Sequence, residues 1–323
     1  MNKSKYFMDL KGIDIKSHLK EYVVYIGFII IFIFFSFVLH DKGFLTGNNL
    51  MNIARQTAMI TVMAIGTTFV LAAGEIDLSI GSTVALSALV TALALRHFNM
   101  PVAIVAGLGT GAIIGFINGF LTAKVGIPSF LVTLGMMGIV FGFARWITNL
   151  RSVPIIDGKY NMIFGSGDIG PISSLFIWTL VLVIIGQIFL KKTPFGRHVL
   201  ATGGNKISSS FSGINVSNIK LSVLVINGVA AALAGMLYAG RLHGARYTLG
   251  EQDLMTVIAA VIIGGTSLFG GKGSIVASLI GSLIMGMTNN GLVLMGLSVD
   301  QQMIFRGVII ILAVSFTLRE KKG

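Results

Sequence analysis

Residues 22–39 read Tyr-Val-Val-Tyr-Ile-Gly-Phe-Ile-Ile-Ile-Phe-Ile-Phe-Phe-Ser-Phe-Val-Leu, a run that holds no charged side chain and no proline. An α-helix of about 20 apolar residues crosses the hydrocarbon core of a bilayer. The run has nearly that length, and it lacks the alternation of period two that strands of a membrane β-barrel show. Residues 22–39 therefore predict a membrane-spanning helix.

Nine further stretches have a similar length and apolar character. The ten predicted spans are 22–39, 53–73, 78–95, 101–123, 128–148, 172–190, 221–240, 254–269, 274–294 and 301–318. Segments that face lipid must satisfy their backbone hydrogen bonds internally, as helices do. We expect an all-α, polytopic membrane protein of about ten transmembrane helices, in which residues 1–323 form a single transmembrane domain. The span 254–269 is short, so the sequence leaves open whether it is a full crossing or a broken, re-entrant helix.

The composition excludes several classes of protein. Of the 323 residues, 54% are hydrophobic and only 11% are charged, whereas a soluble globular domain carries roughly 25% charged residues. Because the chain contains no cysteine, a disulfide scaffold, a thiolate metal site and a cysteine nucleophile are all excluded. The five histidines show no metal-ligand spacing, so we expect no metal site.

The net charge of +12 fits the excess of Lys and Arg that membrane proteins carry on their cytoplasmic side, and we expect no nucleic-acid partner. With the N-terminus inside, 15 of the 24 Lys and Arg fall in inside loops, six in outside loops and three near span edges. This bias predicts a multi-pass membrane protein with both termini cytoplasmic. Residues 1–21 then form a cytoplasmic surface segment, 149–171 an extracytoplasmic loop and 191–220 a cytoplasmic loop.

Residues 50–148 and 220–318 hold four predicted spans each, and the two sets run in opposite directions. Leu71-Ala72-Ala73-Gly74 corresponds in place to Leu237-Tyr238-Ala239-Gly240, and Gly115…Asn118 to Gly286…Asn289. Inverted repeats are common in transporters that alternate access around a central path. The pattern predicts such a pair of repeats.

A few polar residues interrupt the apolar spans. A carboxylate at membrane depth is a functional candidate by default, and Glu75 and Asp77 form the one such pair. They are predicted to line the path or a gate, although Asp77 and Ser79 can instead be helix N-caps of the third span, and for Asp77 the sequence favours the cap. The amides of Asn118, Asn227, Asn289 and Asn290 either bind a polar solute or join helices to one another. With only this pair of carboxylates, a proton relay is disfavoured.

The predicted cytoplasmic loop 191–220 contains a short helical segment. Gly203-Gly204-Asn205 is expected to start a turn, and residues 206–212 are expected to form about two helical turns that end at Gly213 as the C′ residue. Such a segment between two spans can act as a lever for a soluble partner. The chain has no Gly-x-x-x-x-Gly-Lys-Ser/Thr sequence, so any ATP that drives it is bound by another chain, and we expect no cofactor here.

Three motifs, spread from about residue 60 to residue 315, resemble permease subunits of the ribose/galactose/xylose-type ABC importers. They are Gly74-x-Ile-Asp-Leu-Ser-Ile-Gly-Ser82, the loop Phe195-Gly-Arg…Gly-Gly-Asn…Ser-Gly-Ile214, and Ile258-Ala-Ala-Val-Ile-Ile-Gly-Gly-Thr-Ser-Leu-Phe-Gly-Gly-Lys-Gly-Ser274 with Asn290-Gly-Leu292. The resemblance implies a type II importer fold like that of the vitamin B12 permease. It also implies three partners: a second permease chain, an ABC ATPase subunit and an extracytoplasmic protein that delivers the sugar.

The resemblance further implies that residues 203–214 are the coupling helix that enters a groove on the ATPase. The coupling residues are then Gly203, Gly204, Asn205, Ser212, Gly213 and Ile214. The chain departs from the family pattern at Glu75, where a glycine is usual, and at Ser208-Ser209-Ser210, which replaces an alanine-rich stretch.

The function implied is import of a monosaccharide, without covalent chemistry by this chain, so it is not expected to be an enzyme. Related permeases carry nucleosides, autoinducer-like sugars or branched-chain amino acids, which remain alternatives. An ion-coupled secondary carrier and a membrane-embedded enzyme are more distant ones. The enzyme would need a compact acid, base or metal set, and only Glu75 and Asp77 come near one.

Overall fold

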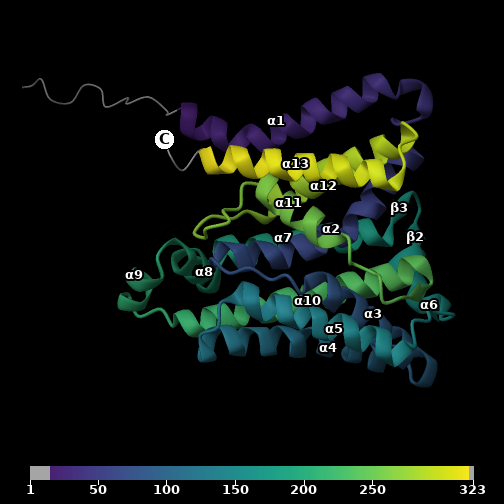
Figure 1. The fold of residues 1–323 in the computed structure, drawn as a ribbon. Helices are drawn as coiled ribbons and strands as arrows, with labels where there is room; N and C mark the ends of the chain where they lie inside the picture. Colours follow the sequence, from purple (N-terminus) through teal and green to yellow (C-terminus); the bar gives the residue numbers. More distant parts are fainter. Residues whose placement is uncertain (1–14, 320–323) are drawn as a thin grey trace, which may run out of the picture.

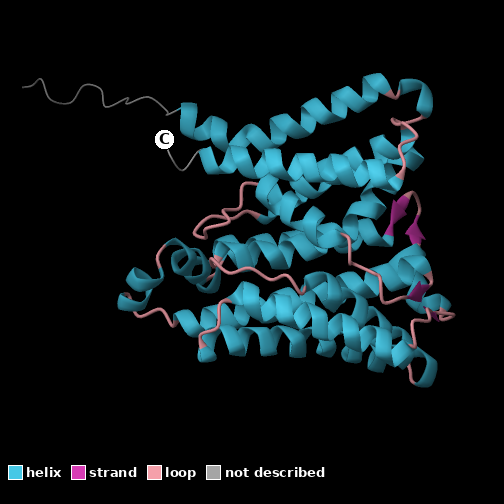
Figure 2. Cartoon of the chain, in the orientation of Figure 1, coloured by secondary structure: helices cyan, strands magenta, loops and turns pink. Residues whose placement is uncertain are grey.

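The computed structural model describes residues 15–319, with side chains over 23–309 and at position 311. The described chain is a bundle of helices joined by short loops, with two small two-stranded ribbons at one end (Figures 1 and 2). The predicted surface segment 1–21 falls largely outside the described residues, and its last residues, 15–21, belong to the first helix.

Nine of the ten predicted spans lie largely within one helix each, and the tenth, 254–269, is helical only in its first part. The long helices are α1 (Ile15–Val38), α2 (Gly47–Ala72), α3 (Ile80–His97), α4 (Met100–Phe120), α5 (Ser129–Thr148), α7 (Ser174–Lys192), α10 (Val216–Leu242), α11 (Asp253–Ile263), α12 (Ile275–Leu294) and α13 (Val299–Arg319). The short elements are 3-10 helix His40–Lys42, β1 (Val153–Pro154), α6 (Gly158–Asn161), β2 (Asp168–Ile169), β3 (Ile172–Ser173), α8 (Pro194–Gly204), α9 (Lys206–Phe211), β4 (Gly244–Ala245), and π-helical turns at Leu121–Val125 and Met162–Ser166.

Within the described residues, seven helices are long and apolar enough to cross a membrane: α2, α3, α4 with its π-helical extension, α5, α7, α10 and α12. Val23–Val38 of α1 and all of α11 are apolar but shorter. The all-α, polytopic membrane fold expected from the sequence is therefore confirmed.

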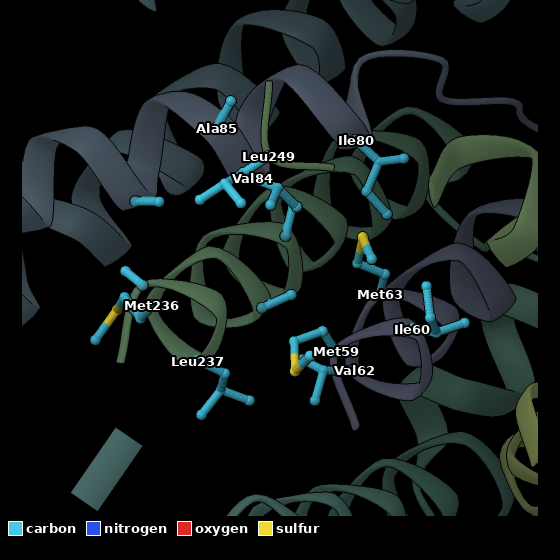
Figure 3. Close-up of a cluster of buried hydrophobic side chains, with 14 of the residues drawn as sticks. Met59, Ile60, Val62, Met63, Ile80, Val84, Ala85, Met236, Leu237 and Leu249 are labelled. Carbon is cyan, nitrogen blue, oxygen red and sulfur yellow. The ribbon is translucent and has the colours of Figure 1, made fainter. Parts of the chain in front are cut away.

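The core of the bundle lies where α2, α3 and α10 meet. Met59 and Met63 of α2, Val84 of α3, and Met236 and Leu237 of α10 are fully buried there (Figure 3). By contrast, α4, α5 and α7 bury only about a quarter of their apolar stretches and present rows of exposed apolar side chains to the outside. This is the arrangement expected when lipid surrounds the bundle.

Glycine lets α4 approach α10 closely. A Cβ atom at Gly111 would collide with the Gly228 carbonyl, and one at Gly115 with the Leu224 carbonyl. Small residues at such crossings are typical of helices packed in lipid, where dispersion contacts hold the helices together.

The two halves predicted as inverted repeats pack through corresponding contacts. α4 packs on α10, and α12 packs on α2 in the same way. α3 packs on α4 and α5, as α11 does on α12 and α13. Gly115 of α4 approaches α10, and Gly286 of α12 approaches α2 at Thr57. Corresponding helices also run in opposite directions along the bundle (Figure 1).

The two ends of the bundle differ. One end, called the α9 end below, carries α8 and α9, the first residue of α1 and the last of α13 (Figure 1). The other, called the β1 end, carries the β1–β4 ribbon, in which Val153 pairs with Ala245, and the β2–β3 ribbon. The segment 149–171, expected as a loop, is partly ordered into β1, α6 and β2, and Tyr160 of α6 buries its ring and donates to the Met236 carbonyl at 3.0 Å.

The predicted span 254–269 is a broken helix. α11 has 11 residues and is therefore only about 16 Å long, too short to cross a bilayer core of about 30 Å. Non-helical residues 264–274 continue toward the α9 end, where the Gly271 N–H donates to the Ala72 carbonyl at 2.9 Å. Pro194, within the predicted loop 191–220, opens α8, where its missing N–H has no cost.

Candidate functional site

The segment between α2 and α3 holds both predicted carboxylates. α2 ends at Ala72, and Gly74 takes a left-handed backbone (φ +75°) that turns the chain. The side chains that follow are buried, since Glu75 is 4% and Asp77 is 7% exposed. A buried carboxylate requires donors around it, so the partners of these two residues define the site.

Asp77 is the centre of a buried polar network. Its Oδ1 accepts from the Ser79 backbone N–H at 2.8 Å and the Ser79 hydroxyl at 2.6 Å, and its Oδ2 accepts from Asn227 Nδ2 of α10 at 2.9 Å. Asn118 Nδ2 of α4 donates to Ser79 Oγ at 2.9 Å. Ser79 occupies the N-cap position of α3, so Asp77 is not the N-cap residue that the sequence favoured. The network joins the α2–α3 segment to α4 and α10.

Hydroxyl groups of α5 hold the backbone of the same segment. The Ile76 N–H donates to Ser129 Oγ at 3.0 Å, and the Leu78 N–H donates to Thr133 Oγ1 at 3.0 Å. These bonds satisfy buried backbone donors that neither helix could satisfy. The position of the segment therefore depends on three helices, α4, α5 and α10.

Glu75 has partners of its own, outside the Asp77 network, and binds two lysines. Its Oε1 lies 2.8 Å from Nζ of Lys220 in α10 and 3.0 Å from Nζ of Lys206 in α9. Burial raises the pKa of the Glu75 carboxyl, but hydrogen bonds from Lys220, Ser129 and Lys206 together outweigh burial and hold that pKa below its ordinary value. Glu75 is therefore an anion that links the α2–α3 segment to α9.

The predicted coupling segment is a pair of short helices. α8 runs through Gly203 and Gly204, which end this helix instead of starting the expected turn. Asn205 caps α9, because its Oδ1 accepts from the Ser208 N–H at 2.9 Å.

The helix α9 ends as predicted at Gly213, whose φ is +81°. The Gly213 N–H donates to the Ser210 carbonyl, and the Ile214 N–H to the Ser209 carbonyl, both at 3.0 Å. This pair of bonds is a Schellman motif. The Ser212 hydroxyl donates to the Ser208 carbonyl at 3.0 Å, so local bonds fix the whole turn.

Close backbone contacts hold α8 against the bundle. A Cβ atom at Gly203 would collide with the Ala72 carbonyl, and one at Gly270 would collide with Gly203. A Cβ atom at Gly204 would make only an ordinary van der Waals contact with Gly271. The end of α2, the end of α8 and the extended residues 264–274 thus meet at one point, and only glycine fits at Gly203.

The outer surface of α9 is apolar and uncovered. Ile207 is 71% and Phe211 is 89% exposed, although both belong to a helix at the very end of the bundle. These two side chains form, with α9, a small projecting surface that a partner can cover.

The predicted residues Asn289 and Asn290 lie in α12, away from the Asp77 network. Asn290 exchanges two hydrogen bonds with Asn49 of α2, at 2.9 and 3.0 Å, and so joins helices. Asn289 lines a polar cavity between α2, α10, α11, α12 and α13. The structure therefore brings together Asp77 and Asn118, places Glu75 beside them, and keeps Asn289 and Asn290 apart from them.

The family described as "Branched-chain amino acid transport system / permease component" matches residues 49–314. This chain belongs to that permease family. The match includes every predicted path and coupling residue.

Curated relatives of the permease align over most of its length. The ribose import permease RbsC of Escherichia coli K12 is 41% identical over 278 residues, which cover 85% of this chain and 87% of that protein. The ribose import permease RbsC of Bacillus subtilis is 38% identical and covers 90% of each chain. The xylose transport permease XylH of Haemophilus influenzae is 31% identical and covers 94% of this chain and 98% of that protein. No solved structure matches the chain. The resemblance to sugar-importer permeases is thereby confirmed.

Sequence reasoning missed four residues of the permease site: Ser129, Thr133, Lys206 and Lys220. A lysine in a loop indicates membrane topology, and a Ser or Thr within a predicted span is explained by helix packing. No local signal links these residues to positions 75–78, because the contacts are set only when the helices pack.

Proposed function

We propose that this chain is the membrane-spanning permease subunit of an ATP-driven importer for a monosaccharide of the ribose, galactose or xylose type. The 41% identity to a ribose import permease over 85% of the chain carries this proposal. The chain itself binds no nucleotide and performs no covalent chemistry. It works as one of two permease chains in a bacterial cell membrane.

The coupling residues Gly203, Gly204, Asn205, Ser212, Gly213 and Ile214 dock onto an ABC ATPase subunit. Exposed Ile207 and Phe211 support this assignment, because apolar side chains on a projecting helix are suited to a groove on a soluble partner. ATP is then bound and hydrolysed by that partner.

The α9 end faces the cytoplasm, and both termini lie on that side. The excess of Lys and Arg in the loops of this end supports the orientation. The β1 end then faces an extracytoplasmic binding protein. Ile156 and Ile169, which are 91% and 71% exposed at that end, offer apolar contacts for it.

Glu75, Asp77 and Asn118 form the gate of the permease, and Asn289 and Asn290 lie on the path side of the second half. The network that joins the α2–α3 segment to α4 and α10 supports a gating role for Asp77, since movement of α10 relative to this segment changes the Asn227–Asp77 bond. Glu75 passes movement of α9 to the same segment through Lys206.

Reconstitution tests the proposal. Proteoliposomes that contain the permease, its ATPase and its binding protein are expected to accumulate D-ribose, D-galactose or D-xylose only when ATP is present. Uptake by the permease alone along an ion gradient would instead identify a secondary carrier. Uptake of nucleosides, autoinducer-like sugars or branched-chain amino acids, with none of these sugars, would overturn the assignment of the solute.

A further inference from the structure

A polar cavity lies inside the described chain, in the half of the bundle nearer the β1 end. Its volume is about 170 Å³, and α2, α10, α11, α12 and α13 form its walls. The polar residues on these walls are Gln56, Thr57, Tyr238, Arg241, Asp253, Thr256, Asn289 and Arg306. Arg241 stands in the last turn of α10, which places the cavity near the β1 end.

Two polar atoms of the cavity wall have no partner in the described chain. Asn289 Oδ1 and Arg306 Nε are both buried and make no hydrogen bond. Asp253, in contrast, has one fixed donor, the Tyr238 hydroxyl, at 2.7 Å from its Oδ2. The wall therefore presents an unused acceptor, an unused donor and a carboxylate with further acceptor capacity. Buried polar atoms without partners are rare in folded proteins.

The cavity has a counterpart in the first half of the chain. Gly250-Glu251-Gln252-Asp253-Leu254 repeats Gly74-Glu75-Ile76-Asp77-Leu78 at four of five positions. Asn289 of α12 corresponds to Asn118 of α4 through the shared Gly-x-x-Asn spacing. In the first half, side chains of this chain fill the space around the aspartate. In the second half, a cavity takes the corresponding place beside Asp253 and Asn289.

The hydrogen-bonding groups of the wall indicate which class of ligand suits the cavity. Carboxylate and amide oxygens accept hydrogen bonds, guanidinium and amide N–H groups donate them, and a hydroxyl group can do both. One carboxylate and two arginines place charges of both signs on the wall, and Ile60 and Met285 add an apolar patch. For size, an apolar cavity of about 150 Å³ holds a benzene ring.

We propose that this cavity binds one uncharged, polyhydroxylated molecule of monosaccharide size within a single permease chain. The assignment rests on the proposed function for the identity of the solute. It adds a place where the sugar binds, distinct from the Asp77 network, and it makes Asn289 and Arg306 ligand-contacting residues.

Cysteine protection tests the cavity directly, because the natural chain contains no cysteine. The variant Gln56→Cys places a thiol on the cavity wall, and Ile156→Cys places one on the exposed β1 end. The purified full chain in lipid nanodiscs is labelled with a maleimide, with and without D-ribose. At a ribose concentration ten times the dissociation constant, labelling of the Gln56→Cys variant is expected to slow about tenfold. Labelling of the Ile156→Cys variant is expected to stay unchanged.

The added substitution Asn289→Leu removes the unused acceptor and fills part of the cavity. In the Gln56→Cys background it is expected to raise the ribose concentration that gives half-maximal protection by about tenfold. Asn48→Leu is the control, since Asn48 is exposed at the start of α2 and does not line the cavity. It is expected to leave protection unchanged.

Equal labelling rates at every concentration of D-ribose, D-galactose and D-xylose would overturn the inference, as would a thiol at position 56 that no maleimide reaches. Uptake by the complete importer is measured in parallel. Uptake without protection refutes the cavity site and leaves the proposed function standing. Protection without ATP-dependent uptake supports the site and refutes the proposed function.

Discussion

The Glu75 carboxylate lies 2.8 Å from the ammonium group of Lys220, and both side chains are largely withdrawn from solvent. The same carboxylate oxygen contacts Lys206 at 3.0 Å. One buried anion thereby connects the α2–α3 segment, the start of α10 and the short helix α9. Because Lys206 is itself 46% exposed, the ion pair with Lys220 contributes more to stability than the pair with Lys206.

Replacement of Glu75 by glutamine is expected to destabilise the permease and to weaken its coupling to the ATPase. The variant loses two charge-assisted hydrogen bonds, and the larger loss, at Lys220, is worth about 2 kcal/mol. Thermal unfolding of the purified chain and ATPase stimulation of the complex measure the two effects. Glu251→Gln is the matched control, because Glu251 holds the corresponding place in the second half and is exposed. Equal unfolding temperatures for the two variants would contradict the structural role of Glu75.

The contribution of Glu75 is expected to depend on pH in one direction. The folded-state pKa of Glu75 is lowered relative to the ordinary value, which is about 4.3 for glutamate. Its contribution is then complete above about pH 4.3 and is lost as the pH falls through the folded-state value. The difference in unfolding temperature between the natural chain and the Glu75→Gln variant should therefore stay constant at neutral pH and shrink in acid. A difference that grows on acidification would refute the ion pair.

Asp77→Asn keeps the size of the side chain and removes its charge. Two donors, Ser79 and Asn227, lose their charged acceptor, so ATP-dependent uptake is expected to fall at least about tenfold, the equivalent of 1.4 kcal/mol. Membrane insertion should remain normal. Asp300→Asn, at an exposed position in the first turn of α13, serves as the control. Unchanged uptake by the Asp77→Asn variant would show that transport does not depend on the charge of Asp77.

Gly213→Trp tests the coupling segment. A residue with a side chain costs about 1–2 kcal/mol in the left-handed conformation that ends α9, and the indole ring would stand at the turn. Pull-down of the ATPase by the permease is expected to be lost. Gly126→Trp is the control, since Gly126 has a similar φ of +89° and open space around it, but ends the turn after α4. Loss of ATPase binding in both variants would contradict the assignment of residues 203–214 as the coupling segment.

The proposed orientation is tested with two exposed positions at opposite ends of the bundle. In intact cells, a thiol reagent that cannot pass the membrane is expected to modify the Ile156→Cys variant and to leave the Phe211→Cys variant unmodified. Both side chains are about nine-tenths exposed, so accessibility within the protein does not differ. Modification of the Phe211→Cys variant alone would show that the α9 end faces the outside of the cell and would refute the proposed orientation.

The sequence determined the helices and several of their ends. Each apolar stretch became a helix, because segments in lipid must satisfy their own backbone groups. The end of α9 at Gly213 followed from the left-handed conformation that glycine favours. These features depend on residues close together in the chain, which is why the sequence was sufficient to predict them.

Only the tertiary structure decided which polar groups meet. Glu75 and Lys206 are 131 residues apart, and Asp77 and Asn227 are 150 residues apart. Segments 74–78 and 250–254 share the pattern Gly-Glu-x-Asp-Leu. Only the structure shows that neighbouring side chains surround Asp77, whereas Asp253 lies on the wall of a cavity. Hydrophobicity and backbone bonding act locally and specify helices, whereas an ion pair or a cavity exists only after packing has set the distances between helices.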